Sequence, residues 1–302
     1  QLLDYFEQNK LLYKSQYGFR KGHSTEMACQ ELIDKLLWMM EDKLVPIGIF
    51  IDMTKAFDTI DHGILLSKLE FYGIKGTELQ LLQSYLTNRK QFTVVDENPS
   101  DLGSVITGVP QGSILGPLIF NIYINDINNA SDLFEMITYA DDTTLITSMN
   151  VMEKHPHKIN KELENISTWL KINRLTVNTK KTKFMIFQNA IRNHLPMCLL
   201  LNGERIESVN SFNYLGITID TKLTFKEHIN KVSHSIARMI GCLRAIKRYL
   251  SEHVLRKIYM ALIQSKIYYG ILVWGHVASK LSRLQKKAIR VISKAKYNAH
   301  TN

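Results

Sequence analysis

The stretch FEMITYADDTTLITS, residues 134–148, sets two adjacent carboxylates between two runs of apolar and β-branched residues. Runs of that composition are typical of β-strands, so residues 136–139 and 143–146 predict a hairpin. Asp141 and Asp142 would occupy its tip, where the backbone of a tight turn suits Asp. A pair of aspartates in a turn is common, so this stretch alone leaves open whether the pair has a chemical role.

A third carboxylate ends a second predicted strand. The run VPIGIFID, residues 45–52, is short and rich in Ile, as buried strands are, and it ends on Asp52. A carboxylate in such a place costs desolvation free energy unless a counter-charge accompanies it. If the two strands are neighbours in one sheet, Asp52 meets Asp141, and three carboxylates in so small a space need divalent cations. Hard oxygen ligands suit Mg²⁺, and two such ions can clamp an in-line phosphoryl displacement.

The remaining pattern predicts a mixed section followed by a helical end. Helices are expected at 1–13, at 25–44, at 62–86 with a break at Gly73 and Gly76, at 157–174 and from 226 onward. Residues 90–107 predict a hairpin with its turn at Asn98–Pro99–Ser100, residues 108–127 a loop followed by an apolar helix, and 183–187 and 212–219 strands. The regular βα alternation of a doubly wound sheet is missing. We therefore predict an α+β fold in which helices cover one face of a sheet.

Charge is divided unevenly along the chain. Residues 1–150 hold 11 Lys and Arg against 20 Asp and Glu, a net charge of −9, whereas residues 151–302 hold 27 against 8, a net charge of +19. Within 221–302 the counts are 17 and 2. Such an excess suits a polyanionic partner, either nucleic acid or an anionic membrane, with a generic solvated basic surface as the simpler alternative.

Composition argues against several other classes of protein. The three cysteines, Cys29, Cys198 and Cys242, are far apart and show neither a CxxC motif nor zinc-ligand spacing, so we expect free thiols in a reducing, intracellular compartment. No run of 18 or more apolar residues predicts a membrane span. The chain opens on Gln1 inside a helical pattern and shows no leader, which suggests a segment of a longer protein.

Six motifs, in order, resemble those of reverse transcriptases. FIDMTKAFD (50–58), GVPQGSILGPLIFNIYINDI (108–127) and YADD (139–142) are similar to motifs A, B and C. LTVNTKKTKFMIF (175–187) resembles motif D, FNYLGI (212–217) resembles motif E, the primer grip, and QYGFRKGHST (16–25) resembles the fingers motif upstream of A. The specific sequences KAFD, GVPQGSILGP and YADD resemble the corresponding motifs of non-LTR, LINE-type retrotransposons. The similarity covers roughly residues 15–275.

This resemblance implies a right-hand polymerase fold. Residues 1–220 would form partial fingers and an antiparallel-sheet palm, and residues 221–302 a helical, basic thumb. The implied activity is that of an RNA-directed DNA polymerase, in which a primer 3′-hydroxyl attacks the α-phosphorus of a dNTP and pyrophosphate leaves. An RNA template, a DNA primer or target DNA, and dNTPs would be the partners, with no membrane.

The family carries further blocks that this chain lacks. Fingers blocks that precede QYGFRKGHST are missing, so the fingers would be partial. Endonuclease and zinc-knuckle domains are missing too, so nicking of target DNA would belong to the remainder of the retrotransposon polyprotein. Nuclear action is implied by the family alone. A catalytically inactive nucleic-acid-binding relic stays open as an alternative, and so does a maturase-type or telomerase-like polymerase, which the KAFD and GVPQGSILGP wording disfavours.

The resemblance also assigns the metal ligands. Asp52 and Asp141 would hold two Mg²⁺ ions, for which Mn²⁺ is a possible substitute. Asp142 would either bind metal or shape the site. The backbone carbonyl of Met53 would add a ligand.

Lysines of two motifs and one arginine are the implied contacts to phosphate. Lys181 matches the motif D lysine that would donate a proton to the leaving pyrophosphate or neutralise it. Lys180 and Lys183 leave this choice open, and a solvated charge run is the alternative. Arg20 and Lys21 resemble fingers residues that meet the triphosphate, and the fork of an Arg matches phosphate oxygens.

The remaining assignments concern the nucleotide and the primer. Phe57 matches the steric gate, whose ring would collide with a ribose 2′-hydroxyl, although a plain core Phe is the alternative. Gln111 and Gly112, in the GVPQG loop, would border the incoming nucleotide, unless the loop merely starts a helix. The primer grip would consist of Tyr214, Leu215 and Gly216.

Overall fold

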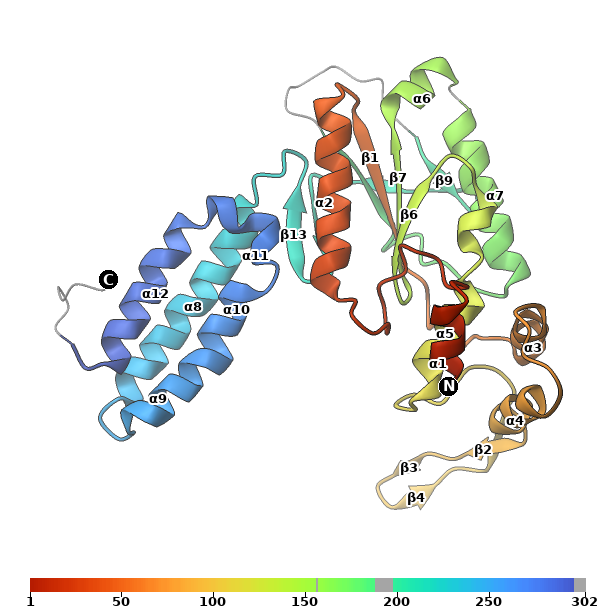
Figure 1. The fold of residues 1–302 in the computed structure, drawn as a ribbon, viewed down its shortest axis with the longest axis horizontal. Helices are drawn as coiled ribbons and strands as arrows, with labels where there is room; N and C mark the ends of the chain where they lie inside the picture. The colour runs from red at the N-terminus through yellow and green to blue at the C-terminus, as the bar shows by residue number, and fades with distance from the viewer. Residues whose placement is uncertain (156, 188–197, 296–302) are drawn as a thin grey trace.

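The computed structural model describes residues 1–155, 157–187 and 198–295. A five-stranded sheet with helices against it forms the centre, and a bundle of helices stands to one side (Figure 1). The predicted order, a mixed section and then a helical end, is confirmed. Residues 296–302 of the expected thumb lie outside the described residues.

The central sheet brings together strands that are far apart in the sequence. Its bounds are Pro46–Ile51 (β1), Glu135–Tyr139 (β6), Asp142–Ser148 (β7), Lys183–Ile186 (β8) and Glu207–Ser208 (β11). The strand order is β11-β8-β1-β7-β6, antiparallel throughout except for the parallel pair β8 and β11. The strand that leads to Asp52 therefore lies between the YADD hairpin and the strand of the motif D segment.

Helices cover both faces of this sheet, so the expectation of helices on one face is wrong. All six residues of β1 are buried. Ile47 and Ile49 share a core with α5 (Leu115–Ile124) and α7 (Lys158–Ile172), whereas Phe50 shares a core with α2 (Thr25–Glu41). Figure 1 shows α2 and α7 on opposite sides of the sheet. Because successive strand residues point to opposite faces, a strand that is apolar at every position needs cover on both.

Short helices lie around both ends of the sheet (Figure 1). Their bounds are Leu2–Gln8 (α1), His62–Phe71 (α3), Gly76–Leu86 (α4), Ile127–Ala130 (η1) and Met149–Lys154 (α6). The predicted break at Gly73 and Gly76 is confirmed, and both glycines have positive φ. The helix expected over 1–13 ends instead at Gln8, and Lys10 takes a left-handed φ of 53°.

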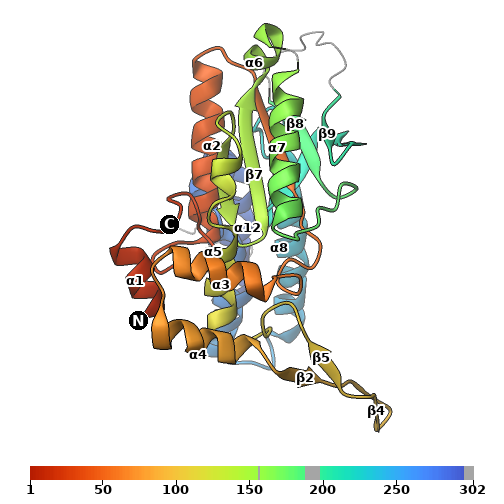
Figure 2. The same ribbon diagram turned by 90° about the vertical axis from the view of Figure 1, so that its right-hand side faces the viewer.

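A β-hairpin projects from the body after α4 (Figure 2). It consists of β2 (Arg89–Gln91) paired with β5 (Gly103–Val105) and, beyond them, β3 (Val94–Val95) paired with β4 (Asn98–Pro99). The turn predicted at Asn98–Pro99–Ser100 lies instead at Asp96 and Glu97, whose φ angles are 47° and 66°. A two-residue hairpin tip of this kind needs positive φ at both positions, and proline cannot adopt it.

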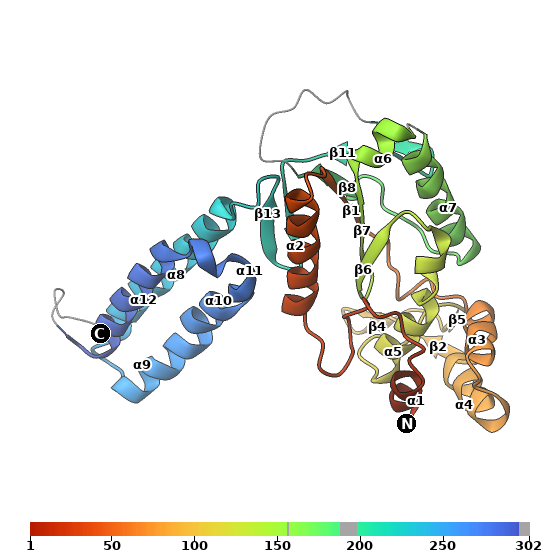
Figure 3. The same cartoon turned by 45° about the horizontal axis from the view of Figure 1, so that its top comes forward.

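The helical end packs on the α2 side of the sheet (Figures 1 and 3). Two small hairpins precede it, β9 (Leu200–Leu201) with β10 (Glu204–Arg205) and β12 (Ser211–Tyr214) with β13 (Ile217–Asp220). The helices are α8 (Lys226–Ile246), α9 (Glu252–Tyr259), the π-helix η2 (Met260–Gln264), α10 (Ser265–Tyr268), α11 (Ile271–Trp274), η3 (Gly275–Val277) and α12 (Ser279–Ile292). Their buried residues, Trp274 among them, form one continuous core with those of α2. Helix α2 therefore connects the helical end to the sheet.

Candidate active site

Strand register decides how the three predicted carboxylates meet. Ile51 pairs with Thr143, so the next residue along β1, Asp52, comes opposite Asp142 at the end of the ladder. Tyr139 pairs with Asp142, which leaves Ala140 and Asp141 as the two-residue tip of the hairpin. The expectation that both aspartates lie in the tip is therefore wrong, because Asp142 already belongs to β7. In this register Asp52 comes opposite Asp142, and Asp141 lies one residue further along, in the hairpin tip.

The three carboxylates share one electrostatic environment. Burial, followed by the charges of Asp141 and Asp52, raises the pKa of Asp142 from 3.8 to about 6. Burial also raises the pKa of Asp141, with a further contribution from Asp52. The charge of Asp52 therefore makes Asp141 and Asp142 harder to ionise, and the charge of Asp141 adds to the effect on Asp142.

The donor set fits a divalent cation, although it is not assembled in advance. Carboxylate oxygens are the ligands that Mg²⁺ prefers, and a cation would relieve the mutual repulsion that raises these pKa values. Within the part of the chain that the structure describes, no group of three or more His, Cys, Asp or Glu side chains is arranged to hold a metal ion. The pair that the register places opposite each other, Asp52 and Asp142, is the more nearly formed part of the set.

We expect the raised pKa of Asp142 to make the free energy of unfolding depend on pH. Because its pKa is higher in the folded chain than its ordinary value, the folded state holds this proton more tightly than the unfolded state does. The stabilisation that the proton provides is therefore lost as the pH rises from about 4 through about 6. In metal-free buffer, Asp142→Asn should raise the free energy of unfolding more at pH 7.5 than at pH 5, as measured by urea unfolding. A gain of equal size at both pH values would contradict the raised pKa.

A cleft of about 210 Å³ joins Asp52 and Asp142 to the motif D segment. Lys181 lines this cleft, and its Nζ lies 3.9 Å from Oδ2 of Asp52. Lys183 instead binds Glu207 and the carbonyl of Lys180, at 2.6 Å each. Of the predicted lysines, the structure thus brings Lys181 to the carboxylates and turns Lys183 away.

The motif D segment also fixes the backbone around Asp52. The N–H of Asp52 donates to Oγ1 of the fully buried Thr182, and its carbonyl accepts from the N–H of Asn178 at 2.8 Å. The N–H of Thr54 donates to the carbonyl of Thr176. These bonds flank Met53 on both sides, so the bridge they form does not engage the Met53 carbonyl, which was the predicted backbone ligand.

Phe57 lies half-buried beside the hairpin. Its ring stacks on Phe120 of α5 at 4.4 Å between centroids and meets Phe19 edge-on at 6.2 Å. Phe19 in turn lies 6.5 Å from the ring of Tyr139. The ring is thus held by neighbouring aromatic side chains and remains partly exposed, and its role as a steric gate stays a prediction.

The GVPQG loop packs on the segment that follows Asp52. Gln111 is exposed and donates from Nε2 to Oδ1 of Asp58 at 2.8 Å. Gly108, with φ of 80°, lies so close to Asp58 that a Cβ would be 2.7 Å from its carbonyl oxygen. Gly112 also has a positive φ, 79°, with open space around it. The loop thus closes on the motif A segment, and a neighbouring hollow of about 630 Å³ is lined by Lys55, Arg89, Lys90 and residues 104–111.

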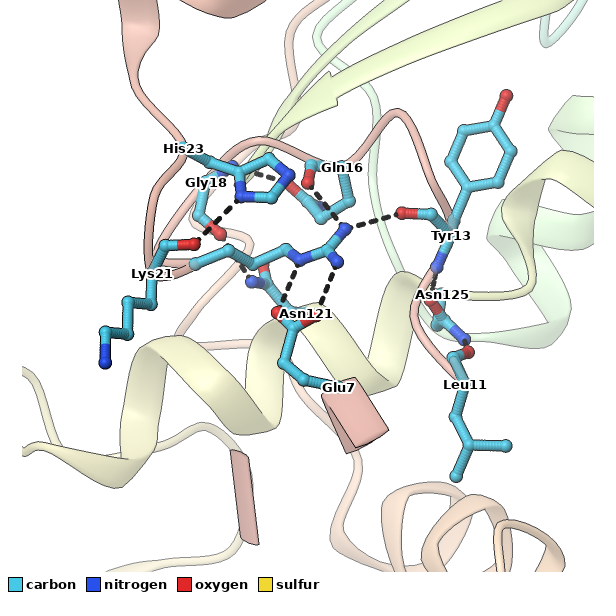
Figure 4. Close-up of polar contacts among 10 residues, drawn as sticks. Glu7, Leu11, Tyr13, Gln16, Gly18, Lys21, His23, Asn121 and Asn125 are labelled. Carbon is cyan, nitrogen blue, oxygen red and sulfur yellow. Dashed lines mark hydrogen bonds and ion pairs between the residues drawn. The ribbon is translucent and has the colours of Figure 1, made fainter. Parts of the chain in front are cut away.

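Arg20 has a different position from the one expected of a triphosphate ligand. Its guanidinium bonds Glu7 through Nε and Nη2 at 2.8 and 2.7 Å, and its Nη1 donates to the carbonyls of Tyr13 and Gln16 (Figure 4). The hydrogen bond from Arg20 lowers the pKa of Glu7. Because these donors are committed within the protein, we do not carry Arg20 into the triphosphate site. Lys21 is exposed and stays a prediction.

Of the predicted primer grip, the turn and not the tyrosine is accessible. Tyr214 is 3% exposed and packs beside Phe50 in the core. Leu215 and Gly216 form the turn between β12 and β13 with φ of 44° and 85°. Tyr269 holds this turn from the helical end, because its hydroxyl donates to the carbonyl of Leu215.

Comparison with known proteins agrees with this geometry. A family described as "Reverse transcriptase (RNA-dependent DNA polymerase)" matches residues 1–219. The chain belongs to the reverse transcriptase family. It is 30% identical over 317 residues to the probable RNA-directed DNA polymerase from transposon BS of Drosophila melanogaster, covering 98% of this chain and 34% of that protein. It is also 30% identical over 308 residues to the RNA-directed DNA polymerase from mobile element jockey of the same species, covering 97% and 33%. These relatives confirm the resemblance to the non-LTR type, and this reverse transcriptase chain spans about a third of their length.

Solved structures confirm the right-hand polymerase fold. Apo telomerase from Candida tropicalis matches with a TM-score of 0.53 at 14% identity, covering 96% of this chain and 52% of that one. Telomerase from Candida albicans, in complex with a fragment of telomeric RNA, matches with a TM-score of 0.52 at 12% identity, covering 97% and 55%. None of the helices in the described part of this reverse transcriptase combines the length and apolarity that a bilayer crossing requires.

Three residues at this reverse transcriptase site escaped sequence reasoning. Thr182 accepts the N–H of Asp52, Phe19 touches the ring of Phe57, and Gln16 bonds the hairpin tip. Two of them lie inside QYGFRKGHST, where the two cations drew attention to phosphate contacts. A polar residue buried in a loop carries no periodic signal, so only the three-dimensional contacts identify Gln16 and Thr182.

Proposed function

We propose that this domain is an RNA-directed DNA polymerase that extends a DNA primer along an RNA template. The observation that carries the proposal is the gathering of Asp52, Asp141 and Asp142 beside Lys181, where burial and the neighbouring carboxylates raise the pKa values of Asp141 and Asp142. Repelling carboxylates at one edge of a sheet have a use where divalent cations meet a polyphosphate substrate.

The reaction joins the primer 3′-oxygen to the α-phosphorus of a dNTP and releases pyrophosphate. Asp52, Asp141 and Asp142 would hold two Mg²⁺ ions, or Mn²⁺ in their place, with the Met53 carbonyl as a further ligand. Bound there, the ions would supply the positive charge that the phosphoryl oxygens need as negative charge develops. Lys181 would neutralise or protonate the leaving pyrophosphate from its place at the cleft.

The dNTP would lie between the hairpin tip and the GVPQG loop. Gln111 and Gly112 would border it, Lys21 would reach its phosphates, and the open face of Phe57 would meet the sugar. This arrangement is supported by the half-exposed ring of Phe57 and by the closure of the GVPQG loop on Asp58.

The primer–template duplex would run from the β12–β13 turn onto the helical end, the thumb. A hollow of about 610 Å³ opens between them and is lined by Gly216 together with Lys231 and Lys266. Two lysines beside a backbone turn suit the phosphates of a primer strand, which a protein contacts without reading sequence. Target DNA and the remainder of the polyprotein, including an endonuclease, would complete the system, which would act in the nucleus.

We expect Phe57→Ala to relax sugar selectivity. Removing the ring would leave room for the ribose 2′-hydroxyl, so the ratio of kcat/KM for dNTP to that for rNTP should fall by about 10- to 100-fold. Single-nucleotide extension with each substrate measures the ratio. Phe71→Ala, at a ring that is 85% exposed on α3, is the control. An unchanged ratio in a folded Phe57→Ala variant would leave Phe57 a packing residue.

Extension of a DNA primer annealed to an RNA template tests the proposal directly. The wild-type chain should add dNTPs in Mg²⁺, and the double variant Asp141→Asn/Asp142→Asn should not. The alternative is a nucleic-acid-binding module without catalysis. Tight duplex binding by the wild type without any extension, in Mg²⁺ or in Mn²⁺, would establish that alternative.

A further inference from the structure

The YADD hairpin has a neighbour on its outer side that the motif assignments do not explain. Among the described strands, β6 is the last in the central sheet, so one of its edges has no strand partner there. The segment Ser15–Tyr17 covers this edge in a parallel bridge between Gln16 and Thr138. Thr138 donates its N–H to the carbonyl of Ser15 at 2.9 Å, and its carbonyl accepts from the N–H of Tyr17 at 2.8 Å. The loop thus caps the outer edge of the sheet with an isolated β-bridge.

The side chain of Gln16 continues this contact to the tip of the hairpin. Its Oε1 accepts from the N–H of Gly18 at 2.8 Å and from the N–H of Ala140 at 3.2 Å. The residue is 2% exposed. Ala140 directly precedes Asp141 and has a left-handed φ of 54°, a conformation that a non-glycine residue needs support to hold.

Gly18 brings the loop against the same peptide. A Cβ at this position would lie 2.3 Å from the Ala140 nitrogen, so only glycine permits the approach. Gln16 and Gly18 therefore contact the hairpin tip through one side-chain oxygen and one stretch of backbone.

The loop that makes these contacts is itself firmly held. Asn121, on α5, donates from Nδ2 to the carbonyl of Gly18 at 2.6 Å. Arg20 ties the carbonyls of Tyr13 and Gln16 to Glu7 of α1 (Figure 4). The side-chain oxygen that accepts the Ala140 N–H thus belongs to a loop that is fixed to two helices, α1 and α5.

We propose that Gln16 is a positioning residue for the carboxylate of Asp141. By accepting the Ala140 N–H, it fixes the peptide that leads into Asp141 and so sets where that carboxylate lies relative to Asp52. Two N–H donors face the amide, so its oxygen is the only atom of the Gln16 side chain that can serve both. The proposal rests on the proposed metal site and assigns the Arg20 network to bracing the catalytic hairpin.

Binding of Mn²⁺ to the intact chain, measured from the electron paramagnetic resonance signal of the free ion, tests this role without turnover. Gln16→Met keeps the length of the side chain but removes the acceptor oxygen, and we expect its dissociation constant for Mn²⁺ to rise on the order of tenfold. Gln16→Asn keeps an amide but draws its oxygen back from Ala140, and it should move the constant in the same direction. Extension kinetics should show a lower kcat with little change in the KM for dNTP.

A matched control separates positioning from stability. Ser167→Ala removes a buried hydroxyl that bonds Leu163 and Asn202 in α7 and its neighbouring turn, away from the hairpin. It should lower the thermal midpoint and leave Mn²⁺ binding unchanged. If Gln16→Met and Gln16→Asn lower the midpoint and yet bind Mn²⁺ as the wild type does, Gln16 is only structural and the proposal is overturned.

One further variant separates failure of the proposed metal site from failure of the positioning role of Gln16. Asp141→Asn removes a proposed ligand directly and should weaken Mn²⁺ binding whatever Gln16 does. If Asp141→Asn binds Mn²⁺ like the wild type, the proposed metal site fails and the role of Gln16 fails with it. If Asp141→Asn weakens binding while the Gln16 variants do not, the metal site stands and only the positioning role is lost.

Discussion

Replacing Asp52 with asparagine should lower the rate constant of nucleotide addition by about 10³-fold or more. Asp52 directly follows the central strand β1, comes opposite Asp142 just beyond the ladder and has a carboxylate oxygen 3.9 Å from Nζ of Lys181. Asparagine keeps the shape of the side chain and removes its charge, which in the proposed site would hold a cation that stabilises the transition state by several kcal/mol. Each 1.4 kcal/mol corresponds to about a factor of ten in rate.

The same substitution should leave folding and duplex binding intact. The Asp52 side chain is 38% exposed and repels its neighbours, so its neutralisation removes no packing and relieves repulsion. Single-turnover extension and fluorescence anisotropy with a labelled RNA–DNA duplex give the two measurements. Asp34→Asn, at an exposed aspartate of α2, controls for loss of one negative charge. Extension by Asp52→Asn at a rate near that of the wild type would exclude Asp52 as a ligand.

The strands that carry the carboxylates could be predicted, because each acidic residue comes at the end of a recognisable apolar or β-branched run. The run before Asp52 is apolar at every position, and the runs around YADD are β-branched, so the strands and their ends are visible in the sequence. The predicted strand register differs from the observed one by one residue, because Asp52 comes opposite Asp142 and not opposite Asp141. Whether Asp141 or Asp142 begins β7 depends on a two-residue tip with a left-handed Ala140, and alanine gives no sign of that conformation.

Two other side chains make contacts that the sequence did not predict, because charge and shape do not reveal which partner a side chain finds. Arg20 could have met a phosphate, but Glu7, only 13 residues away, reaches its guanidinium first. Tyr214 belongs to the primer-grip motif, yet strand alternation turns it into the core and leaves the turn beyond it exposed. The apolar run of β1 already required cover on both faces, so that error lay in the interpretation and not in the information available.

Duplex affinity should fall by about 10³-fold between 50 and 200 mM salt. The helical end carries 17 Lys and Arg against 2 acidic residues in 221–302, a net charge of +15, whereas the rest of the chain is net negative. If six or more of these cations neutralise phosphates, the released counterions give a slope of about −5 in a plot of log affinity against log salt. Anisotropy titrations at several salt concentrations measure this slope, and a flat response would show that the helical end is not the duplex-binding surface.

Two double variants test how much of the salt dependence of duplex affinity comes from the hollow beside the β12–β13 turn. Lys231 and Lys266 both line it. Lys231 pairs with Glu227 at 2.8 Å and bonds the hydroxyl of Thr218 at 3.3 Å, and Lys266 bonds the hydroxyl of Ser235 at 2.5 Å. Lys231→Ala/Lys266→Ala should make the slope shallower by about 2, since each lost phosphate contact removes about one released ion. Lys10→Ala/Lys75→Ala removes the same charge from exposed sites outside the helical end and should leave the slope unchanged. Equal slopes for the two double variants would mean that net charge, and not this hollow, governs binding.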